Sequence, residues 1–234
     1  ALKGELEFAR LLGKTGDVAM ISSVMERLKD SYNRLYWTGE GYRSPSYRDR
    51  TDDRPQAMAV LAGIASEDKY PAIVRVLKTT DMASTYMEKY MVEALFVLGE
   101  PSAALDRMKR RMATIMDERS STLYEHWNWT NSSNHAWSGA NIILLGQKVC
   151  GVAPLTPAFE TFSVRPQMGW LRRASTSFET KYGRISVSLS RKTTKSRSAV
   201  LEIDVPAGTK AEVVLKNSRT AILESGHHKV EVKI

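Results

Sequence analysis

The sequence predicts a chain with two consecutive parts, a helical part over residues 1–155 and an antiparallel β-sandwich over residues 156–234. Two observations carry this prediction. Before about residue 150, apolar residues recur at steps of three and four, which is the spacing of one helix face. After Pro157 they alternate with polar residues at a period of two, the spacing of half-buried strands. Helices followed by strands indicate separate α and β layers and not a βαβ unit.

The helical part reads as serial helical hairpins with short connections, as in solenoids or α/α toroids. Its clearest stripe starts after Asp17, a predicted N-cap, and ends at Leu35. A second N-cap is expected at Asp52 or Asp53. Helices are expected over residues 2–12, 17–35, 53–64, 68–77, 82–98, 102–116 and 134–149. The methionines spaced at i, i+4 on two of them are predicted to fill the core: Met87, Met91, Met108, Met112 and Met116.

Short alternating runs separated by polar turns predict the sandwich. Strict alternation is clearest over residues 185–189, where Ile, Val and Leu are separated by Ser. The other runs cover residues 161–164, 200–205, 211–215 and 230–234, with a further one ending at Phe178. Such spacing favours antiparallel pairing because short polar turns join neighbouring strands.

Composition excludes several classes of protein. The chain has 234 residues, of which 42% are hydrophobic, and no run of 18 apolar residues, so a membrane span is not expected. One cysteine, Cys150, excludes an internal disulfide and is expected to be core filler. The residues leave the compartment open between cytoplasmic, periplasmic and secreted.

The net charge of +8 is concentrated in the second part. Residues 159–234 hold 14 Lys and Arg against 7 Asp and Glu, whereas residues 1–158 hold 20 against 19. The most basic segment is the turn over residues 191–197, which could meet an acidic polysaccharide or nucleic acid. Because no aromatic residues interleave it, we favour a solvated turn, and nucleic-acid binding is not expected.

One segment, residues 121–137, carries the chemistry. It holds three of the five tryptophans, two of the four histidines and one carboxylate, Glu125. Aromatic faces, polar edges and an acid are what a sugar site requires. Glu125 is therefore the leading candidate for proton transfer. The alternative is a surface carboxylate beside tryptophans that only fill space, and His135 could bind a sugar hydroxyl or complete a helix cap.

No metal or cofactor is predicted. His126 and His135 are nine residues apart and have no third ligand nearby in the sequence. The sequence also has no Gly-rich phosphate loop, no Ser-nucleophile elbow and no CxxC motif.

Six short segments follow one another along the chain: Tyr124-Glu125-His126-Trp127, Ser133-Asn134-His135-Ala136, Pro154-Leu155, Phe162 to Pro166, Tyr182-Gly183-Arg184-Ile185 and Asp204 to Thr209. In this order they resemble the C-terminal portion of the bacterial α-L-rhamnosidases, and the resemblance covers essentially the whole chain.

The resemblance implies an inverting glycosidase with an (α/α)6 barrel followed by a β-sandwich. It places the general base on Glu125, within the family's Trp-Glu-x-Trp pattern, although Tyr124 stands where the first Trp is usual. It places a sugar-contacting His on His135, and together with the composition of the loop it predicts Trp127, Trp129 and Asn134 as further sugar contacts. The loop from Glu125 to His135 is shorter than in better-known members.

The resemblance also implies that the general acid lies upstream of residue 1, so that the chain holds the second half of the barrel. We therefore expect the chain alone to be inactive and to self-associate, or to be partly disordered near residues 1–35, because an opened ring exposes apolar seams. Two other functions stay open. One is a six-hairpin glycosidase for another sugar, and the other is a non-catalytic helical scaffold with a carbohydrate-binding sandwich.

Overall fold

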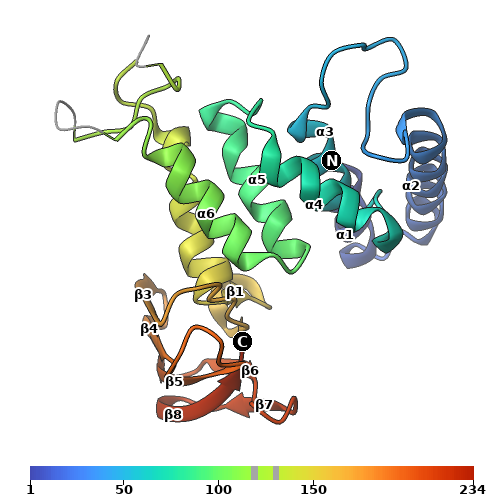
Figure 1. Ribbon diagram of the computed structural model, residues 1–234. Coiled ribbons are helices and arrows are strands. Elements are labelled where there is room, and N and C mark those ends of the chain that lie inside the picture. Colours follow the sequence, from blue (N-terminus) through green and yellow to red (C-terminus); the bar gives the residue numbers. More distant parts are fainter. Residues whose placement is uncertain (117–120, 129–131) are drawn as a thin grey trace. The chain divides into compact units, whose positions relative to one another are not determined.

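The computed structural model describes residues 1–116, 121–128 and 132–234 (Figure 1). The chain forms two compact units, Ala1–Met82 and Ala83–Ile234. The predicted fold class is confirmed, since helices fill the first part and two sheets follow. The domain boundary at residue 155/156 stays a prediction, because the second compact unit contains helices as well as both sheets.

The first unit contains four α-helices in its described residues. They are α1 (Leu2–Leu11), α2 (Thr15–Tyr36), α3 (Asp53–Ala62) and α4 (Tyr70–Thr79), with a 3-10 turn, η1 (Glu67–Lys69), before α4. The N-cap predicted at Asp52 or Asp53 is Asp52, whose carboxylate accepts a 2.8 Å hydrogen bond from the backbone N–H of Arg54. Helix α3 ends before the predicted Ile64 because Gly63 adopts a left-handed conformation.

Apolar side chains on α1 and α2 remain partly uncovered. On α2 only Ile21 is buried, while Leu28 and Leu35 of the predicted stripe are about half exposed. Phe8 and Leu11 on α1 are exposed as well. Self-association of the chain on its own, or partial disorder near residues 1–35, stays a prediction.

The second unit begins with a helical hairpin. Helix α5 (Thr85–Val97) and helix α6 (Pro101–Met112) pack against each other, joined by a short turn (Figure 1). Met91 and Leu95 of α5 are fully buried, as predicted. The core prediction is wrong for Met116, which is exposed because α6 ends four residues before it.

The helical segment predicted over residues 134–149 is present from Ala136 to Val149, but it is not one regular α-helix and it starts two residues late. The chain instead forms a 3-10 turn, η2 (Ala136–Gly139), one α-helical turn, α7 (Asn141–Leu144), and a π-helical turn, η3 (Leu145–Val149). The physical reason is competition from the preceding loop. The backbone N–H of His135 donates to Leu123 O, and the Ser138 hydroxyl donates to Tyr124 O, so this end of the segment is fastened to the loop.

The strands form two four-stranded sheets. The first has the order β1-β2-β6-β7, and the second has the order β3-β4-β5-β8. Their bounds are β1 (Val152–Pro154), β2 (Thr161–Val164), β3 (Arg173–Thr180), β4 (Gly183–Ser190), β5 (Ser198–Val205), β6 (Lys210–Val214), β7 (Thr220–Leu223) and β8 (Gly226–Lys233). All pairs are antiparallel except β2 with β6, which is parallel. The short strands β1 and β7 were not predicted.

Alternating side chains from both sheets make one core. Phe162 and Val213 come from the first sheet, and Ile185 and Leu201 come from the second, all of them fully buried. Cys150 lies in this core as expected, and burial raises the pKa of its thiol to about 11. None of the described helices is both long and apolar enough to cross a membrane.

Candidate active site

Glu125 lies in the irregular connection between α6 and η2, and its backbone is held on both sides. Its N–H donates a 2.9 Å hydrogen bond to Ser132 O. Its carbonyl oxygen accepts a hydrogen bond from the hydroxyl of Thr85, the first residue of α5. A buried helix end therefore sets the position of Glu125, although the connection itself has no regular structure.

The carboxylate of Glu125 is about three-quarters covered and is flanked by two imidazoles. Its side chain is 23% exposed. Its Oε2 accepts from the backbone N–H of Ser132 at 3.4 Å and lies 3.7 Å from His135 Nδ1, while its Oε1 lies 4.0 Å from His126 Nε2. A carboxylate that solvent still reaches, among neutral or cationic neighbours, can accept a proton from water.

The structure brings His135 and Glu125 together, as the site prediction requires. The ring of His135 lies against Trp137, with centroids 4.0 Å apart and planes inclined by 36°. At 3.7 Å its Nδ1 is too far from the Glu125 carboxylate for a direct hydrogen bond, and no described group bonds to this nitrogen. The alternative that the His135 side chain caps a helix is not borne out, because this side chain forms no cap hydrogen bond at the start of η2.

Of two further predicted sugar contacts, Asn134 is exposed to solvent, whereas Trp127 is held in place by its neighbours. Asn134 is exposed, and its backbone exchanges hydrogen bonds with the Ser132 hydroxyl. The indole N–H of Trp127 donates a 2.8 Å hydrogen bond to Ala83 O, and the Arg111 guanidinium lies over its ring at 4.0 Å from the centroid. Trp127 is thus fixed against the start of α5. The remaining predicted sugar contact, Trp129, lies outside the described residues.

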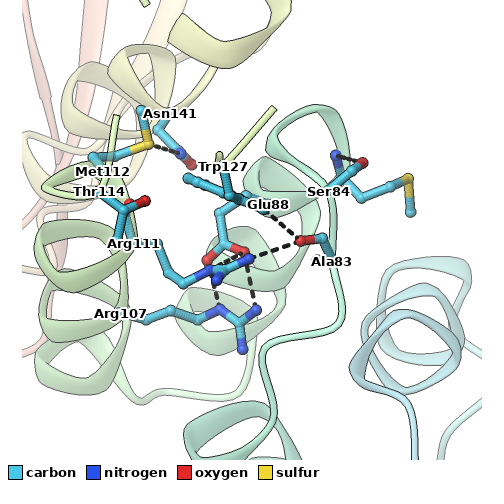
Figure 2. A network of polar contacts seen from close by, with 10 residues as sticks. Ala83, Ser84, Glu88, Arg107, Arg111, Met112, Thr114, Trp127 and Asn141 are labelled. Atoms are coloured by element: carbon cyan, nitrogen blue, oxygen red, sulfur yellow. Dashed lines mark hydrogen bonds and ion pairs between the residues drawn. The ribbon is translucent and has the colours of Figure 1, made fainter. Parts of the chain in front are cut away.

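Next to Trp127 lies a buried network of charged side chains that was not predicted from the sequence (Figure 2). Glu88 on α5 binds Arg107 on α6 through two hydrogen bonds, Nε to Oε1 at 2.6 Å and Nη2 to Oε2 at 2.9 Å. Both side chains are almost completely buried, at 0% and 1% exposure. Arg111 Nε lies 3.5 Å from Glu88 Oε2, and Arg111 Nη2 donates to Ala83 O at 2.8 Å.

A signal for this network existed in the sequence. Glu88 occupies the same face of α5 as Val92 and Leu95, at i, i+4 and i+7, and both of these are buried. A charged residue on an apolar helix face requires a buried partner of opposite charge. Arg107 and Arg111, spaced at i, i+4 on the next helix, are the matching residues.

A second missed feature is an exposed aromatic pair. Tyr86 in the first turn of α5 and Trp137 in η2 meet edge-to-face, with ring centroids 5.3 Å apart. The side chains are 47% and 42% exposed. Trp137 belongs to the aromatic segment singled out above, whereas Tyr86 comes from a distant helix. Together with His135 they present apolar ring surface beside the carboxylate of Glu125.

Comparison with known families gives the context for this geometry. Residues 151–230 match the family described as the bacterial alpha-L-rhamnosidase C-terminal domain. None of the curated proteins compared with the chain matches it.

Solved α-L-rhamnosidases have the same fold over nearly the whole chain. The enzyme from Dictyoglumus thermophilum superposes with a TM-score of 0.79 at 17% identity, covering 98% of this chain and 30% of its own. The Aspergillus terreus enzyme gives 0.75 at 18% identity, covering 97% and 28%. The Streptomyces avermitilis enzyme, solved in complex with L-rhamnose, gives 0.75 at 17% identity, covering 97% and 25%.

The resemblance drawn from the sequence to the C-terminal part of the α-L-rhamnosidases is therefore confirmed. The chain spans less than a third of the length of each of these solved structures. At these identities the likeness establishes the fold, while the roles of Glu125 and its neighbours stay predictions. Within residues 1–116, 121–128 and 132–234, no three His, Cys, Asp or Glu side chains lie close enough to share a metal ion.

Proposed function

We propose that this chain supplies the general base of a glycoside hydrolase that cleaves terminal α-L-rhamnosides, and that Glu125 is this base. The observation that carries the proposal is the setting of the Glu125 carboxylate. It is 23% exposed, has two imidazoles within 4.0 Å, and stands on a backbone held by both α5 and Ser132. The match of residues 151–230 to the family described as the bacterial alpha-L-rhamnosidase C-terminal domain supports the choice of rhamnoside.

In this proposal Glu125 takes a proton from a water molecule, whose oxygen attacks the anomeric carbon of rhamnose. The bond from that carbon to the leaving oxygen breaks on the opposite face, and a second carboxylic acid protonates the leaving oxygen. The product has inverted configuration, so an α-L-rhamnoside yields β-L-rhamnose. Inverting enzymes hold the two carboxyl groups roughly 6.5–9.5 Å apart, which leaves room for the water.

The general acid is proposed to come from a part of the protein upstream of residue 1. The solved rhamnosidases to which the chain is similar are each more than three times its length, which is consistent with a second carboxylate outside these residues. The 234-residue chain on its own is accordingly expected to be inactive.

The sugar is proposed to lie against His135 and the exposed faces of Tyr86 and Trp137. Asn134 is exposed at the same place and offers an amide to a further hydroxyl. Trp127 and Trp129 are proposed as additional sugar contacts, Trp127 through the ring face that Arg111 does not cover.

The test is a Glu125→Gln substitution in the full-length protein, assayed with an aryl α-L-rhamnoside. Glutamine keeps the shape of the side chain but cannot accept the proton, so turnover should fall by about 10²–10⁴-fold. A Glu125→Ala variant given azide, a nucleophile that needs no base, should regain turnover and form a β-rhamnosyl azide. Near-normal turnover of Glu125→Gln would rule Glu125 out as the base.

Substrate class is tested separately by assaying the unaltered full-length protein on a panel of aryl glycosides. Strict preference for another sugar would favour a different six-hairpin glycosidase. Absence of turnover on every glycoside, combined with sugar binding that depends on the loop tryptophans, would favour a non-catalytic scaffold.

A further inference from the structure

The sandwich neutralises nearly all of its acidic side chains internally. Five of the seven carboxylates between residues 159 and 234 form ion pairs with Lys or Arg of the same domain, and a sixth, Asp204, lies 2.8 Å from the imidazole of His227. The ion pairs are Glu179 with Arg184, Glu202 with Lys229, Glu212 with Arg165, Glu224 with Lys210 and Glu231 with Lys216. The positive charge of the domain therefore resides mainly on the bases left over from these pairs.

Five of the remaining bases gather at one end of the second sheet. They are Arg172, Arg173, Lys192, Lys195 and Arg197, and we refer to them as the basic end. All five are exposed, and none of them forms an ion pair with another described residue. Arg172 and Arg173 stand where β3 begins, while the other three lie in the turn between β4 and β5.

Backbone pairing places these two segments side by side. The N–H of Arg191 donates a 3.0 Å hydrogen bond to Arg172 O, and Arg173 lies opposite Ser190 in the β3–β4 register. The turn is itself closed by a hydrogen bond from Ser196 N to Thr193 O at 3.2 Å. The five charges are therefore held on adjoining backbone and not on a free tail.

The side chain of Arg191 forms hydrogen bonds with the segment before β3 and with the β4–β5 turn. Its guanidinium donates to Leu171 O at 2.7 Å, to Ser196 O at 3.1 Å and to Gly169 O. One side chain thus ties the connection before β3 to the far side of the β4–β5 turn. A charged surface arranged before its partner arrives loses less conformational freedom on binding.

From this arrangement we propose that the basic end is a docking surface for an anionic polysaccharide that carries uronate carboxylates. Three of the five bases are arginines, whose planar guanidinium groups match a carboxylate with two parallel hydrogen bonds. A single-stranded nucleic acid requires aromatic platforms for its bases, and the turn over residues 191–197 has none. The choice of a polysaccharide rests on the proposed glycosidase function, whereas the charge arrangement does not depend on it.

The surface would hold an acidic chain on the sandwich while a rhamnose end of the same or a neighbouring chain meets the Glu125 loop. Local concentration of substrate would then rise without any new contact at the reacting sugar. Binding at the basic end is expected to weaken as salt rises, because the charges are exposed to solvent.

The test compares two variants with the same change in net charge. One removes three unpaired bases of the turn (Lys192→Ser, Lys195→Ser, Arg197→Ser), and the matched control removes three paired bases of the same domain (Arg184→Ser, Lys210→Ser, Lys216→Ser). Affinity for polygalacturonate is measured in the full-length protein at low and at physiological salt. The turn variant should bind about tenfold more weakly, and the control should change less than about twofold.

A second variant, Arg172→Ser with Arg173→Ser, tests the other segment and should also weaken binding. Fully methyl-esterified polygalacturonate, which has no carboxylate charge, should not bind. Equal losses in the turn variant and the control would overturn the proposal, because net charge alone would then explain binding. So would tighter binding of single-stranded DNA than of polygalacturonate, or no binding of polygalacturonate at all.

Failure of the basic end to bind polygalacturonate can be distinguished from failure of the proposed glycosidase function. A Glu125→Gln variant should keep its affinity for polygalacturonate, since the basic end is untouched. The turn variant should hydrolyse a small aryl rhamnoside at the unaltered rate, because that substrate does not reach the basic end.

Discussion

The loop that carries Glu125 and the β-sandwich beside it are held by different kinds of interaction. The sandwich is held by continuous backbone pairing, such as the eight-residue registers of β3 with β4 and of β5 with β8, around one apolar core. The loop is held by a few side chains that reach it from α5 and α6, among them Thr85 and Arg111. The geometry of the candidate site therefore depends on individual side chains, whereas the geometry of the sandwich depends on repeated backbone hydrogen bonds and alternating buried side chains.

The two regions also use charge differently. In the sandwich the ion pairs are mostly on the surface, as in Arg184 with Glu179, where both side chains are about two-thirds exposed. Between α5 and α6 the pair of Glu88 with Arg107 is almost completely buried. Exposed pairs contribute little to stability, whereas removing one partner of a buried pair leaves an uncompensated charge out of water.

The largest effect is expected from Glu88→Gln. This change removes the negative charge between Arg107 and Arg111, and it replaces one of the two oxygens that accept from Arg107 by an NH2 group, which cannot accept. We expect the free energy of unfolding to fall by about 3–5 kcal/mol, measured by urea denaturation of the full-length protein.

The matched control for this substitution is Glu93→Gln on the same helix. Glu93 pairs with Lys89 at 2.6 Å in an i, i+4 arrangement, and both side chains remain partly exposed. Its loss should cost less than about 1 kcal/mol. Similar losses for the two substitutions would show that burial does not separate these pairs, and the contrast drawn above would fail.

Gly151→Ala tests the sandwich at a position where a single residue controls the backbone. Gly151 has a φ of +78°, and a Cβ there would lie 2.2 Å from the backbone carbon of Arg165. The same two residues are joined by a hydrogen bond from Arg165 N to Gly151 O. We expect Ala at this position to lower the free energy of unfolding by about 2–4 kcal/mol, measured by urea denaturation.

Gly208→Ala separates the two causes of this loss. Gly208 has nearly the same φ, +76°, but the closest atom to its Cβ is 3.8 Å away on Tyr182. Its substitution carries only the backbone penalty, which is about 1 kcal/mol. If both variants lose the same amount, close approach of the Arg165 backbone is not what requires glycine at position 151.

The same contrast explains what could be predicted from the sequence. Alternation over residues 185–189 and 200–205 predicted strands that are present as β4 and β5. The strands β1 and β7 were missed because neither alternates, since β1 ends in Pro154 and β7 has three consecutive apolar residues, whereas the equally short β2 alternates. The segment 134–149 has an apolar composition suited to a helix and is helical from Ala136, but tertiary hydrogen bonds at His135 and Ser138 tie its start to the preceding loop.

In the candidate site, too, some residues could be predicted from the sequence and others could not. The loop composition predicted Glu125 and His135, which the structure brings within 3.7 Å of each other. The residues that fasten the loop, Thr85 and Arg111, come from helices 40 and 14 positions away in the sequence. Their roles depend on which helix faces meet, and no local pattern in the sequence specifies this.

Arg111→Lys addresses the loop directly, with the smallest expected effect on stability. Lysine can keep the ion pair with Glu88, but it lacks the planar group that covers the Trp127 ring and donates to Ala83 O. Trp127 donates to the same carbonyl, so both anchors of the loop loosen together. We expect kcat on an aryl α-L-rhamnoside to fall by about 10- to 100-fold through misplacement of Glu125, with little change in KM.

Arg107→Lys is the matched control, because Arg107 binds the same carboxylate, Glu88, without contacting Trp127 or Ala83 in any described hydrogen bond. It should lower the free energy of unfolding by about 1–3 kcal/mol and leave kcat within about twofold. Arg111→Lys should show the opposite balance, with activity lost and stability nearly kept. If kcat instead falls in proportion to stability in both variants, the network supports only the helices, and the position of Glu125 must be fixed by Thr85 and Ser132 alone.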